Sequence, residues 1–152
     1  MPRRRRPSKS EAAVVAHLRT TGIPFVHDQA GFFEGRPLLR PDVVVPSLRL
    51  VIEVDGIQHM PGRSTKWKSY TRGGVNPNDL YKDEACAAAG FHVARIPYTV
   101  KVCDVSKVVD RALEHARKYP TGPLLGAYRT DYYHHPRPLP WVGGQVIDLT
   151  SD

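Results

Sequence analysis

Three acidic side chains stand at the ends of two apolar runs that are close together in the sequence. Asp42 lies near the start of the run at residues 40–45, and Glu53 and Asp55 close the run at residues 49–55. Side chains two positions apart in a strand share a face, and a hairpin would bring Asp42 across from Glu53. Clustered carboxylates raise each other's pKa, and a bound divalent cation relieves that repulsion. The pattern therefore predicts a Mg²⁺ or Mn²⁺ site with Asp42, Glu53 and Asp55 as oxygen ligands.

An alternative is that arginine side chains neutralise these acids. Arg36, Arg40 and Arg49 are near them in the sequence. In that case the carboxylates form ion pairs and bind no metal.

A basic segment follows the second apolar run. Between residues 56 and 76 the chain carries Lys and Arg but no Asp or Glu, and aromatic side chains stand among the cations. Cations contact backbone phosphates and aromatic rings stack on bases, so we expect this segment to bind DNA; a solvated loop is the alternative. The residues expected to contact DNA are Arg63, Lys66, Trp67, Lys68, Tyr70 and Arg72.

The composition narrows the class of protein. The chain has 152 residues and a formal net charge of +7, which favours an anionic partner. It has no apolar run near the roughly 20 residues that a membrane helix needs, and no apolar N-terminal stretch typical of a signal peptide. Its 2 cysteines cannot build a disulfide framework. We therefore expect a cytoplasmic protein that binds DNA and no membrane.

The elements that must position the acids can be read from capping residues and periodicity. Ser8 and Glu11 form a capping box at the start of a helix, and Gly22 ends it. Pro77 opens a second helix and Gly90 stops it. The predicted helices cover residues 8–22, 76–90 and 104–119, and the predicted strands cover residues 25–28, 40–45, 49–55 and 91–96. This order predicts an α/β fold with a small mixed β-sheet flanked by helices.

Three regions of the chain differ in character. Residues 1–7 form a basic N-terminal arm, residues 8–119 the α/β domain, and residues 120–152 a proline-rich extended tail. The arginine block at residues 3–6 has three open interpretations: a disordered arm, a localisation signal or a minor-groove reader. Extended proline-rich segments lose little entropy on binding, so the tail is a candidate docking strip for a protein partner.

Two segments resemble a known superfamily of nucleases. Residues 40–59, RPDVVVPSLRLVIEVDGIQH, and residues 79–98, DLYKDEACAAAGFHVARIPY, are similar to the PD-(D/E)xK nucleases. Within that superfamily they are most similar to the branch of the very short patch repair and EDxHD endonucleases. The resemblance implies a restriction-endonuclease-like core.

The resemblance also implies roles for individual residues. Asp42 would be the central metal ligand and Glu53 the second ligand. Asp55 occupies the position of the lysine in the (D/E)xK element, which leaves the general base open. His59 matches the histidine of the EDxHD branch, and a histidine can accept a proton near neutral pH.

Acids on two predicted helices complete this implied site. Glu11 fits the acid of the first helix, and Asp83 fits the final acid, with Asp79 one turn earlier as a rival. Asp83 could orient the ring of His59. Lys82 is a candidate for a migrated lysine, although helical spacing turns it away from the face of Asp83.

These observations predict a metal-dependent endonuclease that nicks or cleaves duplex DNA. The metal would be Mg²⁺ or Mn²⁺, and the site residues would be Glu11, Asp42, Glu53, Asp55, His59 and Asp83. Two alternatives remain: a DNA-binding module that has lost turnover, or a small subunit of a phage, transposition or packaging assembly.

Overall fold

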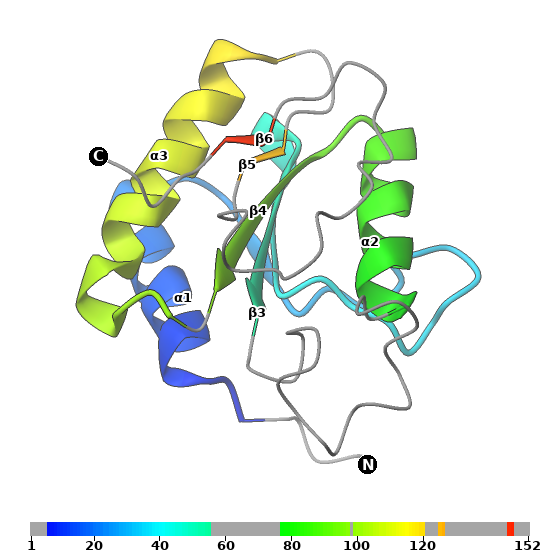
Figure 1. Ribbon diagram of the computed structural model, residues 1–152, viewed down its shortest axis with the longest axis horizontal. Helices are drawn as coiled ribbons and strands as arrows, with labels where there is room; N and C mark the ends of the chain where they lie inside the picture. Colours follow the sequence, from blue (N-terminus) through cyan, green and yellow to red (C-terminus); the bar gives the residue numbers. More distant parts are fainter. Residues whose placement is uncertain (1–5, 56–76, 98, 121–124, 127–145, 148–152) are drawn as a thin grey trace.

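The computed structural model describes residues 6–55, 77–97, 99–120, 125–126 and 146–147. Its helices and strands form three layers (Figure 1): α1 and α3 cover one face of a central sheet, and α2 covers the other. The longer elements are α1 (Lys9–Thr21), β2 (Val43–Val45), β3 (Leu50–Asp55), α2 (Pro77–Ala88), β4 (His92–Pro97) and α3 (Val105–Lys118). The predicted fold class, a small mixed sheet flanked by helices, is confirmed.

Helix α1 begins and ends where the sequence signals predict. The Ser8 hydroxyl accepts a hydrogen bond from the Glu11 backbone N–H at 3.1 Å, which satisfies one of the free donors of the first turn. Gly22 ends the helix in the left-handed region, with φ of 73°, a conformation that costs glycine little. The cap places Glu11 in the first turn of the helix.

The sheet is mixed. The pairs β1 (Val26–His27) with β2 and β2 with β3 are antiparallel, whereas β3 pairs with β4 in parallel. A tight turn at Pro46–Leu48 connects β2 to β3, which confirms the predicted hairpin. Parallel strands need a crossover connection, and α2 lies within the crossover from β3 to β4.

Alternation along the strands produces a core on each face of the sheet. Val43 and Ile52 pack toward α1 and α3, whereas Val44 and Val51 pack toward the side of α2, where Cys86 is buried. Continuing the same alternation, Asp42, Glu53 and Asp55 fall on the face covered by α2.

Two short strands extend the sheet beyond β4. Leu125–Gly126 (β5) pairs in parallel with β4, and Val146–Ile147 (β6) pairs in parallel with β5. The sequence predicted only an extended tail here, because two-residue strands carry no periodic signal. Within the described residues, no helix is long and apolar enough to cross a membrane.

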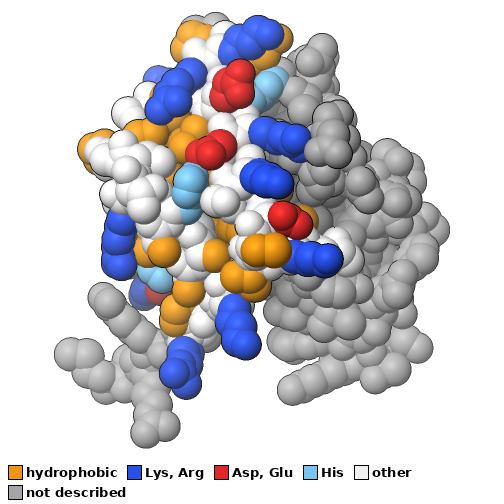
Figure 2. Space-filling model, turned by 90° about the vertical axis from the view of Figure 1, so that its left-hand side faces the viewer, with side chains coloured by type: hydrophobic (Ala, Val, Ile, Leu, Met, Phe, Trp, Pro, Cys, Tyr) orange, Lys and Arg blue, Asp and Glu red, His pale blue; other side chains and the backbone are white. Residues whose placement is uncertain are grey.

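Figure 2 shows the side of the molecule formed by α1 and α3, on which cationic, acidic and apolar side chains are intermixed. Glu53 and Asp55 of β3 lie on the opposite face of the sheet, which α2 covers.

Candidate functional site

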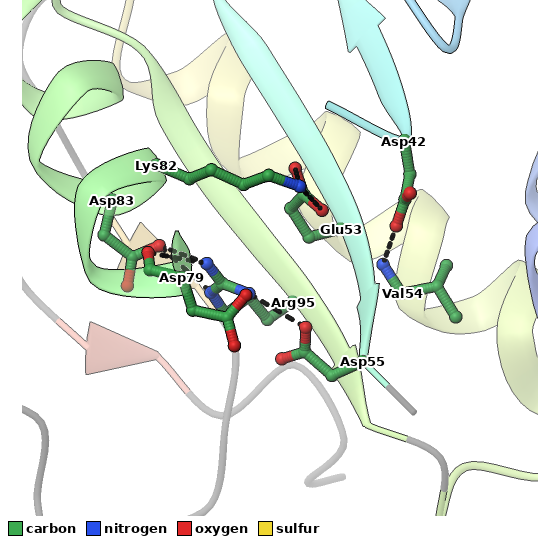
Figure 3. Close-up of polar contacts among 8 residues, drawn as sticks. All are labelled: Asp42, Glu53, Val54, Asp55, Asp79, Lys82, Asp83 and Arg95. Atoms are coloured by element: carbon green, nitrogen blue, oxygen red, sulfur yellow. Dashed lines mark hydrogen bonds and ion pairs between the residues drawn. The ribbon is translucent and has the colours of Figure 1, made fainter. Parts of the chain in front are cut away.

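Asp42 and Glu53 face each other across the β2–β3 hairpin. The strand register pairs Val43 with Ile52, so the next pair along the hairpin is Asp42 and Glu53. Strand β3 extends past the end of β2, and an Asp42 carboxylate oxygen accepts the Val54 backbone N–H at 2.7 Å (Figure 3). This hydrogen bond continues the ladder with a side chain and holds the Asp42 carboxylate at the end of the sheet.

Helix α2 brings a lysine to the same carboxylates. Lys82 Nζ donates to both oxygens of Glu53, at 3.1 and 3.2 Å. Both side chains are largely removed from water, with exposed fractions of 13% for Lys82 and 5% for Glu53. Figure 3 shows Lys82 extending from α2 across the sheet toward Glu53. An ammonium and two buried carboxylates thus meet in one place.

Burial and mutual repulsion change the protonation of these acids. Burial, with the charge of Glu11 adding to it, raises the pKa of Asp42 to about 6, even though the Val54 N–H and Lys82 favour its ionised form. Burial and then the charge of Asp42 raise the pKa of Glu53 to about 8, against the attraction of Lys82. The two carboxylates therefore hold a proton near neutral pH, and a cation of higher charge can replace that proton.

A cavity of about 570 Å³ opens over these residues. Its lining includes Glu11, Asp42, Glu53 and Lys82, together with His27 on β1. Glu11 and His27 contact each other at 3.0 Å between Oε2 and Nε2. The cavity has room for a phosphodiester group and contains carboxylates, an ammonium and an imidazole.

The other predicted acids lie next to this cavity, around a buried arginine. The guanidinium of Arg95 on β4 is fully buried and contacts Asp55 at 2.8 Å and Asp83 at 3.0 Å. It also donates to the backbone carbonyl of Asp79 at 3.3 Å. The structure thus brings Glu11, Asp42 and Glu53 together as predicted, but it places Asp55 and Asp83 on Arg95 and not among the residues that line the cavity.

Helical geometry explains the separation of Lys82 from Asp83. Successive residues of a helix are about 100° apart around its axis, so Lys82 is directed to Glu53 while Asp83 is directed to Arg95. Asp55, two positions beyond Glu53 on the same face of β3, reaches Arg95 as well. The sequence suggested Arg36, Arg40 and Arg49 as partners for the acids, whereas the guanidinium that contacts Asp55 comes from β4.

The remaining predicted residues fall outside the described part of the chain. These are His59 and the expected DNA contacts Arg63, Lys66, Trp67, Lys68, Tyr70 and Arg72.

The residues that are described fit a magnesium ion in part. No group of three or more His, Cys, Asp or Glu side chains among them is arranged to hold a metal. Mg²⁺, however, is often held by one or two carboxylates together with waters and substrate phosphates. Asp42 and Glu53, opposite each other in the hairpin and both lining the cavity, meet that smaller requirement.

Sequence reasoning missed two residues of this region. His27 stood at an ordinary strand position, and only the folded chain shows that it contacts Glu11 and lines the cavity. Arg95 carried a recognisable signal: it interrupts the apolar strand at residues 91–96. A cation in such a place is rarely buried without a paired acid, and Asp55 and Asp83 are those acids.

Comparison with known proteins adds no relatives. No protein-family model matches the chain, and neither curated proteins nor solved structures gave a significant match. The function must therefore be argued from the residues of the cavity.

Proposed function

We propose that this protein is a divalent-metal-dependent DNA endonuclease of the PD-(D/E)xK type, which hydrolyses phosphodiester bonds in duplex DNA. The observation that carries the proposal is the meeting of Asp42 and Glu53 with Lys82, which contacts Glu53 at 3.1 Å, in one cavity. In this arrangement Lys82, supplied by α2, takes the place of the lysine that is absent at Asp55. The +7 net charge favours a polyanionic substrate, and a cytoplasmic location gives access to DNA.

The residues of the cavity divide the chemistry among them. Asp42 and Glu53 would hold Mg²⁺ or Mn²⁺, which when bound neutralises charge on the phosphate and makes the attacking water more acidic. Lys82 would place its ammonium beside the phosphate and stabilise charge that develops on it. Glu11 orients the ring of His27, whose imidazole would serve as general acid or base toward the attacking water or the leaving oxygen.

The proposal is tested by plasmid cleavage with Mg²⁺ or Mn²⁺ and with EDTA. Asp42→Asn and Glu53→Gln should each reduce the metal-dependent rate by about a hundredfold or more, the effect typical of losing a preorganised electrostatic contact. Asp110→Asn is the matched control, because Asp110 lies on α3 and its side chain is 62% exposed. Equal rates for wild type and both site variants would rule the nuclease out.

A second function, a DNA-binding module without turnover, is favoured by the Lys82–Glu53 contact. Both oxygens of Glu53 are already engaged by the ammonium, which suits a site that is neutralised internally. Such a module would bind DNA with salt-dependent affinity but would not cleave it, whichever divalent metal is added. A protein partner for the proline-rich tail is compatible with either function and stays a prediction.

A further inference from the structure

Two histidine side chains meet beneath the C-terminal end of α3. His92 begins β4 and is buried, with 3% of the residue exposed. Its ring meets the ring of His115 on α3 edge to face, with centroids 6.2 Å apart. The His115 ring also lies against the ring of Tyr119, which follows α3, at 4.8 Å between centroids. The two histidines therefore belong to the packing that holds the last turn of α3 on the sheet.

The hydrogen bonds of this pair suit neutral rings. His92 Nε2 lies 2.8 Å from the backbone carbonyl oxygen of Tyr119, and because a carbonyl only accepts, this nitrogen carries a hydrogen. Among the described residues, His115 Nε2 is the buried side-chain nitrogen without a hydrogen-bond partner. A neutral ring can leave that nitrogen without a hydrogen, whereas an imidazolium would bury an unpaired N–H there. The site thus favours a neutral His115.

The charged groups of α3 itself oppose a proton on His115. Arg111 lies one turn before it, and Lys118 lies less than one turn after it. Glu114 is exposed and about 100° away around the helix axis. The acid one turn further back, Asp110, contacts His17 of α1 at 2.6 Å.

The sheet adds no negative charge at this point. His92 comes from β4, and the side chain of Arg49 reaches the turn that precedes β4. Burial, followed by the neighbouring His92 and Lys118, lowers the pKa of His115. No carboxylate of the described residues offsets a positive charge on this ring.

We propose that His92 and His115 form a pH-sensitive latch, which holds the last turn of α3 and the following strand β5 on the sheet and opens when His115 is protonated. Strand β5 pairs with β4 at Val93, directly after His92. The latch lies at the start of β4, whereas Glu53 of the cavity pairs with Arg95 further along. The proposal therefore does not depend on the nuclease function.

The direction of the pH response follows from the protonation of the closed and open forms. Above about pH 6.5, the usual pKa of histidine, His115 is neutral in both forms and the latch is closed. Below that pH the open form takes up a proton more readily than the closed form, so a falling pH favours opening. Opening leaves the edge of β4 free to pair with other chains.

Hydrogen exchange of the full chain in EDTA tests the latch, at about pH 7.5 and pH 5.5, on either side of the usual histidine pKa. After correction for the chemical pH dependence of exchange, residues 115–119 and β4 should exchange several-fold faster at the lower pH, while α1 stays protected. His115→Phe keeps a ring that cannot be protonated and should remain protected at both pH values. His17→Gln is the matched control, because His17 also contacts α3, and it should respond as wild type does.

A second variant tests the charge directly. Lys118 is exposed, and Lys118→Gln removes a positive charge that opposes protonation of the closed form, so it should reduce the response to pH. Equal corrected rates at both pH values would overturn the latch, as would an undiminished response in His115→Phe or in Lys118→Gln. Faster exchange along the whole chain at the lower pH would indicate global unfolding and would overturn it too.

Discussion

The positive charge of Lys82 compensates part of the negative charge of Asp42 and Glu53 in the cavity. Its pKa is raised: burial alone would lower it, but the negative charges of Glu53 and Asp42 outweigh that effect. Lys82 therefore stays protonated, and the proton that the carboxylates retain near neutral pH sits on Asp42 or Glu53.

Removing the lysine should have an effect that depends on pH. Lys82→Met leaves Glu53 buried without its ammonium, and breaking such a pair costs roughly 3–5 kcal/mol when the remaining charge persists. We expect a cost of that size in urea unfolding at about pH 9, and a smaller one at about pH 6, where Glu53 can take up a proton. The double variant Lys82→Met with Glu53→Gln should recover much of the loss. The same cost at both pH values would contradict this assignment.

The raised pKa values also predict how the metal-free protein responds to pH. The folded state holds the protons of Asp42 and Glu53 more tightly than the unfolded chain does. Below about pH 4 the two acids therefore make their whole contribution to the free energy of unfolding. That contribution is lost as the pH rises through about 6 and then about 8, the raised pKa values of Asp42 and Glu53.

This contribution can be isolated in EDTA by comparing wild type with the Asp42→Asn, Glu53→Gln variant in urea titrations. Between about pH 5 and 8 the free energy of unfolding of wild type should fall by a few kcal/mol relative to that of the variant. Added Mg²⁺ should reverse most of that fall by binding the ionised carboxylates. A difference that stays constant with pH would show that the two acids are not buried as described.

We expect the position of helix α2 on the sheet to depend on the buried arginine of β4. Arg95 on β4 contacts Asp55 on β3 and Asp83 on α2, so one guanidinium links three elements. Asp83 contacts this arginine while its neighbour Lys82 contacts Glu53, so we expect the link to hold the rotation of α2 that directs Lys82 at Glu53. Arg95 is thus a positioning residue for Lys82, which it does not itself need to contact.

Loss of this link should loosen α2. Arg95→Met leaves several buried carboxylates without the cation, and we expect unfolding free energy to fall by roughly 3–5 kcal/mol. Hydrogen exchange should increase first in Pro77–Ala88. Arg95→Lys should restore little of the stability, since an ammonium cannot reproduce the planar set of donors. Stability within about 0.5 kcal/mol of wild type, the range of ordinary surface changes, would contradict this role.

The C-terminal part of the chain adds two short strands to the sheet, β5 and β6. Residues 125–126 pair with β4, and residues 146–147 pair with residues 125–126. A chain that ends at residue 120 therefore exposes the edge of β4. An unpaired edge favours pairing with other chains.

Truncation tests the contribution of these strands. Deleting residues 121–152 should lower the melting temperature and promote self-association, measured by differential scanning fluorimetry and light scattering. Deleting only residues 148–152 keeps both strands and is the control. If both truncations match the full chain, the short strands contribute nothing to stability.

Local signals in the sequence are sufficient to predict the elements whose ends are marked by capping or turn residues. Ser8 and Gly22 define α1, and the proline and β-branched pattern defines the β2–β3 hairpin, so the sequence alone places Asp42 and Glu53 across from each other. Hairpin register is a short-range property, and helix caps act within one turn. The fold class follows from the order of these elements.

Contacts between distant segments needed the folded chain. Whether Asp55 and Asp83 join the cavity or pair with Arg95, and whether Lys82 reaches Glu53, depends on how α2 is rotated over the sheet. That rotation results from packing and ion pairs among three elements, which no local pattern encodes. The same holds for His27 beside Glu11 and for His92 beside His115, because each depends on where a strand comes to lie against parts of the chain remote in sequence.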